Sequence, residues 1–309
     1  MGISMLSIML FHQYFTSAIP FNYFHNFGYW GVDIFMYLSG MGLVTSLERN
    51  SNVVYYKRRF KRLFPSCILC GTTKYFTFLI MGTSVSVLQE GLKIGVWSIA
   101  SLDLWFIHSI IILYVISPLL YHSLCNWGKT TLFFILTIFF INGFTLRPLV
   151  GYDWLSIPGV ISWTIERLPV FTAGMFVGIN KKLSDKTINI SYLFLFIAIS
   201  LRLLRKTEMS FLGIEACEYI SLTFGIPALI VFCIIVIKVL PSYVKCFLNF
   251  MGSYSLELYL THEFIFWVLK ICLEDKYSPW ILLPSAFFLS FVAAFICKLT
   301  INKLLIQHE

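Results

Sequence analysis

Charged residues are scarce in this sequence. Asp, Glu, Lys and Arg together make up 12% of the 309 residues, whereas about a quarter of a soluble globular domain is charged. So little charge cannot cover a globule with polar surface, which excludes a soluble fold. The charges fall in gaps between apolar runs that recur from end to end. The sequence therefore predicts an all-α polytopic integral membrane protein, in which each helix needs roughly 20 apolar residues to cross the bilayer.

Polar linkers and low-complexity tracts are lacking as well. The longest polar gap runs only from Leu203 to Glu218, and no Gly/Ser linker or internal repeat stands out. We therefore expect a single membrane domain over residues 1–309, with no appended soluble domain. The net charge of +8 does not indicate nucleic-acid binding, because much of it lies in short loops beside apolar runs.

Ten membrane spans are predicted along the chain. Their ranges are 4–20, 29–47, 64–82, 105–124, 131–146, 168–180, 188–203, 218–240, 247–271 and 280–300. We interpret 83–104 and 148–165 as re-entrant or interfacial helices. The positive-inside rule favours cytoplasmic N- and C-termini, since the loops then inside hold most of the Lys and Arg. The expected location of this multi-pass protein is the plasma (inner) membrane.

A metal site is not predicted. The eight cysteines lie mostly in apolar segments, and Cys67 and Cys70 form a CxxC on a segment that we expect to be a helix beginning at Pro65. Neither a second CxxC nor a nearby histidine completes a set of metal ligands. We interpret these thiols as packing groups.

Ionisable residues within spans are candidates for function, because each costs roughly 2.5–3.5 kcal/mol on insertion. They are His12, Asp33, His108, Glu257 and His262. A hydrogen bond to a carbonyl explains a lone histidine such as His108. His12 and Asp33 lie on helices joined by a short loop, so antiparallel packing could place the carboxylate against the imidazole. A general base needs such a partner to fix its tautomer and raise its basicity, although spacing alone leaves the pairing open.

A basic run, YYKRRFKRLFP, occupies residues 55–65. Its five cations are Lys57, Arg58, Arg59, Lys61 and Arg62. One interpretation is a topogenic signal that also contacts anionic lipid head groups. Arg59 and Arg62 are three residues apart, however, and on a helix they share a face and would form a clamp for phosphates.

Five stretches resemble the membrane acyltransferase family 3, the bacterial glycan O-acetyltransferase group. They are GISMLSIMLFH, GVDIFMYLSG, YKRRFKRLFP, LWFIHSIIILYVISPLL and MGSYSLELYLTHEF, and a sixth, weaker match is ERLPVFTAGMFVG at 166–178. Their order along nearly the whole chain is fairly specific. The resemblance implies a ten-helix enzyme that moves an acyl group, usually acetyl, from cytoplasmic acyl-CoA to a hydroxyl on a surface glycan or lipid-linked sugar. It implies no bound cofactor.

The resemblance also implies roles for single residues. His12 matches the family's catalytic base, and Arg59 and Arg62 match an RxxR motif that engages the CoA phosphates, with Arg58 beside them. Asp33 matches the second-span motif, and from our own reading of the residues we expect Asp33 or another acid to orient His12. Ser39, Trp105 and Tyr114 lie in motifs for which we expect packing roles. Further candidates are Glu166, Arg167 and His262.

The family's first motif has Arg or Lys eleven residues before the histidine, a position that here is Met1. We expect that a short lead preceding this start is missing, and the alternative is that the cation has been lost. Two other functions stay open: a transporter or lipid flippase with an intramembrane His/Asp pathway, and a degenerate scaffold. Dependence on acyl-CoA separates the enzyme from both. A relay through a soluble domain would need a separate envelope partner.

Overall fold

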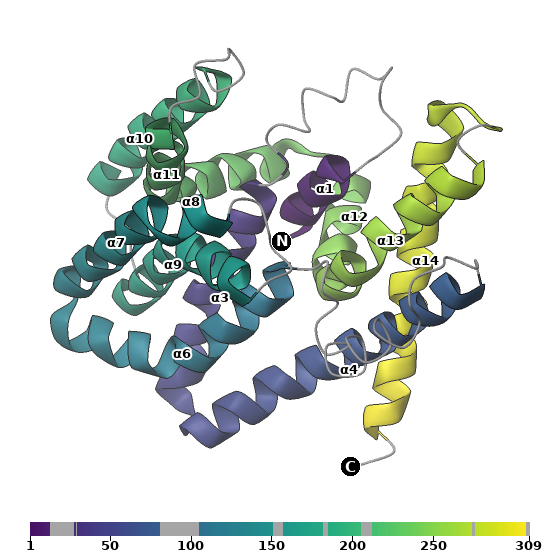
Figure 1. Ribbon diagram of the computed structural model, residues 1–309, viewed down its shortest axis with the longest axis horizontal. Coiled ribbons are helices and arrows are strands. Elements are labelled where there is room, and N and C mark those ends of the chain that lie inside the picture. Colours follow the sequence, from purple (N-terminus) through teal and green to yellow (C-terminus); the bar gives the residue numbers. More distant parts are fainter. Residues whose placement is uncertain are drawn as a thin grey trace. The chain divides into compact units, whose positions relative to one another are not determined.

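The protein is helical throughout the part of the chain that the structure describes (Figure 1). This computed structural model describes residues 1–12, 28, 30–80, 105–150, 157–181, 185–204, 212–273 and 276–306. The helices are α1 (Gly2–Phe11), α3 (Trp30–Arg49), α4 (Asn52–Ile80), α6 (Trp105–Trp127), α7 (Lys129–Phe144), α8 (Leu146–Val150), α9 (Ile157–Asn180), α10 (Asp185–Leu204), α11 (Leu212–Val239), α12 (Ser242–Ser253), α13 (Ser255–Leu273) and α14 (Pro279–Ile306). The predicted all-α class is confirmed.

Seven helical segments among the described residues are long and apolar enough to cross a membrane. They are α3, α6, α9, α10, the segment Lys129–Val150 formed by α7 and α8, Cys217–Val239 of α11 and Pro279–Lys303 of α14. The chain is therefore a multi-pass membrane protein. The predicted spans 4–20, 64–82 and 247–271 are not among the seven, so the count of ten and the cytoplasmic termini stay predictions.

Several predicted helix boundaries are wrong. We expected a short span at 168–180 and an interfacial segment at 148–165, but α9 runs unbroken from Ile157 to Asn180. The charged pair Glu166–Arg167 does not end this helix, because both side chains are buried and ion-paired. The predicted segment 83–104 lies outside the described residues.

Two further corrections concern α4 and the predicted span at 247–271. Pro65 neither begins nor ends a helix but lies inside α4, since neighbouring groups in membrane proteins re-satisfy the backbone that a proline frees. The predicted span at 247–271 is two helices, α12 and α13, with a break at Tyr254. Lys298 of α14 stabilises this break: its Nζ donates to the Ser253 carbonyl at 2.5 Å and lies 4.2 Å from the Tyr254 ring centroid.

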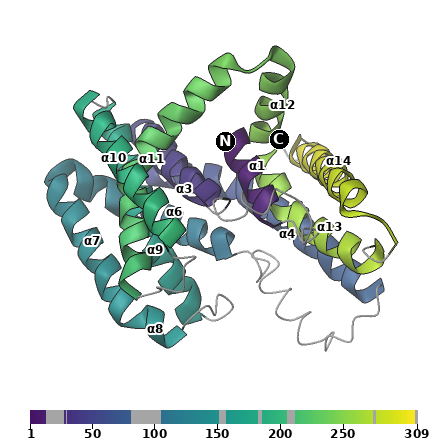
Figure 2. The same cartoon turned by 90° about the horizontal axis from the view of Figure 1, so that it is seen from above.

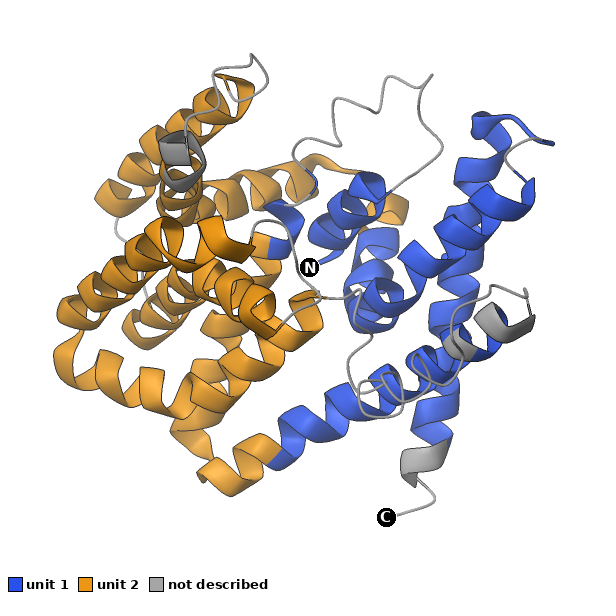
Figure 3. Cartoon of the chain, in the orientation of Figure 1, with its two compact units in different colours: residues 1–32, 57–104, 246–309 blue, residues 33–56, 105–245 orange. Residues whose placement is uncertain are grey.

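The chain divides into two compact units (Figure 3). Unit 1 comprises Met1–Val32, Lys57–Leu104 and Cys246–Glu309, and unit 2 comprises Asp33–Tyr56 and Trp105–Lys245. One chain thus alternates between the units, and boundaries between them fall inside α3, α4 and α12. The prediction of a single domain over 1–309 stays a prediction.

Unit 1 contains α1, α13 and α14. Helix α1 packs against α13, and α13 packs along α14, as Figure 2 shows for the second pair. The start of α1 also touches α12, where a Cβ on Gly2 would lie 2.0 Å from the Leu248 carbonyl oxygen. Only glycine permits this approach of the two backbones, so residue 2 fixes where α1 sits beside the later helices.

In unit 2, the backbones of α3 and α9 approach each other closely. A Cβ on Gly40 would lie 2.1 Å from the Phe171 carbonyl oxygen, and one on Gly174 would lie 2.1 Å from the Tyr37 carbonyl oxygen. The two glycines let the helix backbones touch, as small residues do at membrane helix interfaces. This contact brings the first turn of α3 beside the middle of α9, where the charged residues of unit 2 lie.

Candidate active site

His12 lies at the carboxyl end of α1. Its backbone N–H donates to the Ile8 carbonyl at 3.1 Å, which closes the last turn, and its side chain is 20% exposed. We expected it inside a span over 4–20, but the helix ends at Phe11 and residues 13–20 lie outside the described part. His12 is therefore a helix-end residue, and carbonyl groups of the last turn place partial negative charge near its ring.

The His12 imidazole contacts two side chains of α13. Its Nδ1 lies 3.1 Å from His262 Nε2 and 3.4 Å from Glu263 Oε2. The two imidazole rings are stacked, with centroids 5.1 Å apart and planes 14° apart. Two histidines and a carboxylate of unit 1 thus form one cluster, which joins the first described helix to a segment 250 residues later.

His262 is the fixed member of this cluster. Its side chain is fully buried, and its Nδ1 lies 2.8 Å from the Leu258 carbonyl oxygen and 3.0 Å from that of Tyr259. The rings of Tyr259 and Phe266 pack on either side of the same residue in α13. These contacts leave the His262 ring little freedom to rotate.

Asp33 pairs with an arginine of its own unit. Its Oδ1 lies 2.9 Å from Nε of Arg167, and the side chains are only 1% and 2% exposed. Both residues belong to unit 2. Arg167 neutralises the carboxylate within unit 2, and residues of α13 contact the His12 imidazole within unit 1. The pairing of His12 with Asp33 stays a prediction.

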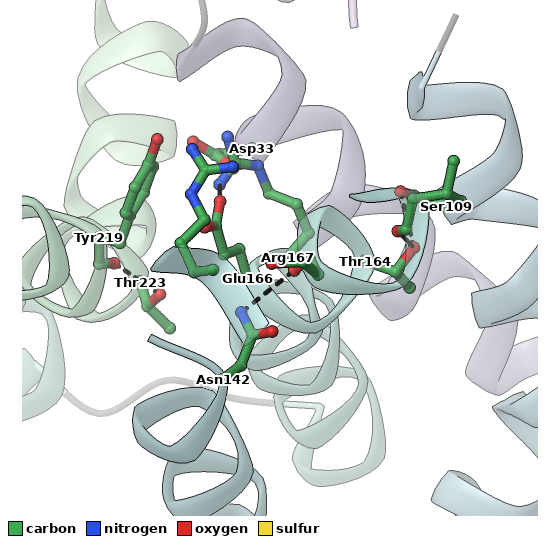
Figure 4. A network of polar contacts seen from close by, with 11 residues as sticks. Asp33, Ser109, Asn142, Thr164, Glu166, Arg167, Tyr219 and Thr223 are labelled. Atoms are coloured by element: carbon green, nitrogen blue, oxygen red, sulfur yellow. Dashed lines mark hydrogen bonds and ion pairs between the residues drawn. The ribbon is translucent and has the colours of Figure 1, made fainter. Parts of the chain in front are cut away.

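Arg167 is the centre of a charged network (Figure 4). Its Nη1 lies 3.9 Å from Glu166 Oε2, and Glu166 Oε1 lies 3.0 Å from Nε of Arg147. The Arg167 guanidinium also lies 4.7 Å from the Tyr219 ring centroid and 5.3 Å from that of Trp105. The network joins α3, α6, α8, α9 and α11 in unit 2. Its balanced charges fit a role in holding these helices together.

Trp105 and Tyr114, for which we expect packing roles, contact other aromatic residues. The ring of Trp105 lies 5.2 Å from that of Trp163, centroid to centroid. The carbonyl of Tyr114 accepts a hydrogen bond from Tyr55 Oη at 3.2 Å. Pro118, one turn later in α6, has no N–H to give that carbonyl, so the Tyr55 hydroxyl supplies a donor there. Ser39 is half-buried in α3.

The basic run lies on a single helix, α4. Arg58 and Arg62 are exposed and Arg59 is half-buried on α4. Because Arg59 and Arg62 are three residues apart on this helix, they share a face. They belong to unit 1, as do His12 and His262.

The remaining candidates are buried. His108 is 7% exposed in α6. The Sγ atoms of Cys70 and Cys297 lie 3.4 Å apart, and Ser66 Oγ donates to Glu257 Oε1 at 3.3 Å. These contacts fit the packing role expected for the thiols. No group of three metal-ligating side chains occurs in the described ranges.

Sequence reasoning did not identify Glu263 or the contact between the two histidines. The one local signal was the stretch THEF, which places Glu263 next to a histidine already singled out. Nothing in the sequence pairs residue 12 with residue 262, since that contact depends on how α1 packs against α13.

Comparison with protein-family models finds one that describes an acyltransferase domain, and it matches residues 2–299. No curated protein and no solved structure matches the chain significantly. The matched range includes the histidine cluster, the basic run and the charged network.

Proposed function

Because the chain belongs to acyltransferase family 3, we propose that it is a membrane O-acyltransferase that moves an acyl group, which we expect to be acetyl, from cytoplasmic acyl-CoA to a hydroxyl of a surface glycan. An envelope glycan or a lipid-linked sugar is the expected acceptor, and the plasma (inner) membrane is the expected location. The family match and the seven apolar segments support a membrane transferase. The identities of the acyl donor, the acceptor and the particular membrane belong to the proposal.

The histidine cluster is the observation that carries the proposal. The His12 imidazole takes the proton of the acceptor hydroxyl, and the oxygen forms a bond to the thioester carbonyl carbon. The carbon–sulfur bond then breaks, and the departing CoA thiolate takes the proton back from the imidazolium. Glu263, 3.4 Å from His12 Nδ1, stabilises the positive charge while it lasts. A variant of this route, in which His12 activates a protein group that carries the acyl unit, uses the same base.

The basic run is the proposed donor site. Arg59 and Arg62 would each form charge-assisted hydrogen bonds to CoA phosphates, with Arg58 beside them. The flexible remainder of CoA would then carry the thioester toward the membrane. Membrane lipids would contact the other exposed cations of the same run.

The test is transfer of labelled acetyl from acetyl-CoA to envelope glycan in membranes that contain the full chain. His12→Ala should abolish transfer. His122→Ala removes an exposed histidine of α6 that contacts Asn126, and it should leave transfer unchanged. The chain and its His12→Ala variant are each also made in a second form, which has an upstream extension and Arg in place of Met1. Full activity in His12→Ala would end the general-base role. Folded protein without acyl-CoA-dependent transfer in any form would favour a transporter, a flippase or a scaffold.

A further inference from the structure

The geometry points to His262 as a positioning residue: we propose that it accepts a hydrogen bond from His12 Nδ1–H and so holds the basic lone pair of His12 on Nε2. This inference rests on the proposed function, because it assigns the nitrogen that takes the acceptor's proton. It adds a residue that does not touch substrate and acts only through His12.

The proton on His262 is placed by its carbonyl partners. Its Nδ1 lies within 3.0 Å of the carbonyl oxygens of Leu258 and Tyr259. A carbonyl oxygen only accepts hydrogen bonds, so Nδ1 carries the proton. A neutral imidazole has one N–H, and Nε2 of His262 is therefore an acceptor.

The proton on His12 follows from two acceptors that lie near its Nδ1. His12 Nδ1 faces the His262 Nε2 lone pair at 3.1 Å and a carboxylate oxygen of Glu263 at 3.4 Å. Both neighbours are acceptors, so Nδ1 carries the proton and Nε2 carries the lone pair. A doubly protonated His262 would instead direct its Nε2–H at His12 Nδ1. Two N–H groups would then face each other, because His12 Nδ1 carries the proton that it donates to the Glu263 carboxylate.

His262 and Glu263 differ in what they can do for His12. His262 is fully buried and tied to the backbone of α13, so it fixes direction. Glu263 is 30% exposed and contributes charge. A rigid acceptor at Nδ1 fixes the tautomer and the ring orientation of His12 before substrate binds. No free energy is then needed to select them during the reaction.

Nitrogen NMR of the full chain with ¹⁵N-labelled histidine tests the assignment, since ring ¹⁵N shifts distinguish protonated from unprotonated nitrogens. The His12 signals are identified by their loss in His12→Ala. Wild type should show the His12 proton on Nδ1. In a Glu263→Leu background, where the carboxylate no longer faces His12 Nδ1, His262→Phe fills the same space without an acceptor, and the proton should move largely to Nε2. In the same background, His262→Gln, whose amide offers both an acceptor and a donor, should keep Nδ1 protonated.

Transfer kinetics supply the second readout. His262→Phe should lower kcat roughly 100-fold, at the low end of the about 10²–10⁴ that a positioned base contributes, with the KM for acetyl-CoA unchanged. His262→Gln should recover most of kcat, and His122→Phe should change neither quantity. A change in KM alone would overturn the positioning role.

The NMR measurement needs no donor or acceptor, so it separates this inference from the proposed function. A wild-type His12 with its proton on Nε2, or one that keeps Nδ1 protonated in His262→Phe/Glu263→Leu, would overturn the inference whatever the activity. If His262→Phe does not accumulate in membranes, the wild-type spectrum and His262→Gln still decide. Absence of acetyl transfer beside an Nδ1-protonated His12 would count against the proposed function alone.

Discussion

Asp33 and Arg167 form a buried ion pair that joins α3 to α9. Their closest atoms, Oδ1 and Nε, are 2.9 Å apart, and neither side chain is more than 2% exposed. Charges at such depth persist only when they are paired. The pair therefore explains how Asp33 can occur in a helix apolar enough to cross a membrane.

Asp33→Asn and Arg167→Gln should each destabilise the protein, because each leaves one buried charge without its counter-charge, at a cost of roughly 3–5 kcal/mol. The double variant should recover much of the loss. Thermal unfolding in detergent, followed by the fraction that stays monodisperse, measures the effect. Glu48→Gln is the matched control, since it breaks a largely exposed pair with Lys181 worth about 0–1 kcal/mol. Equal loss in the control and in Asp33→Asn would contradict the role of burial.

Gly40→Ala should separate α3 from α9, because the new Cβ would lie 2.1 Å from the Phe171 carbonyl oxygen. Gly42→Ala, two residues later in the same helix, meets nothing within 4 Å. It should be neutral or stabilise by about 0.5–1 kcal/mol through helix propensity. Melting temperatures of the two variants check this, and similar values for both would show that the close contact of α3 with α9 does not determine stability.

Tyr55→Phe should destabilise unit 2 by about 0.5–1.5 kcal/mol, because it removes one hydrogen bond to a carbonyl of a half-buried residue. The affected carbonyl is that of Tyr114, which Pro118 cannot serve. Adding Pro118→Ala restores an N–H at that turn of α6, so the double variant should be more stable than Tyr55→Phe alone. A double-mutant cycle by thermal unfolding measures the coupling, with Tyr192→Phe in an exposed position as control. If the effects of the two changes on stability were strictly additive, the Tyr55 hydroxyl would not be taking the place of the N–H that Pro118 lacks.

Arg59→Ala and Arg62→Ala should each raise the KM for acetyl-CoA roughly 10- to 100-fold, the loss expected for one or two charge-assisted hydrogen bonds of about 1.5–3 kcal/mol. The kcat should change less, since neither residue is placed at the reacting atoms. Arg49→Ala removes an exposed cation at the end of α3 and serves as control. An unchanged KM in both variants would leave the basic run with its topogenic and lipid-binding roles.

The class of protein and most of its helices could be predicted from the sequence, because they depend on local properties. Apolar runs of about 20 residues predict membrane helices wherever they occur, and the motifs around His12, Arg59 and Arg62 placed the chain in its family. Prolines were the weak point of this local reasoning. Pro65 and Pro169 both lie inside helices, since a proline's effect depends on what neighbouring helices offer the freed carbonyl.

The pairing of ionisable groups was decided only by the tertiary structure. The sequence could not show that Asp33 pairs with Arg167 in unit 2, or that His12 lies against His262 and Glu263 in unit 1. Each charge or imidazole meets its partner through packing between helices far apart in the chain, and the backbone contact at Gly40 is one such determinant. Periodicity identifies which residues are costly to bury, but not which distant helix stabilises them. That choice is made by the fit of whole helix surfaces.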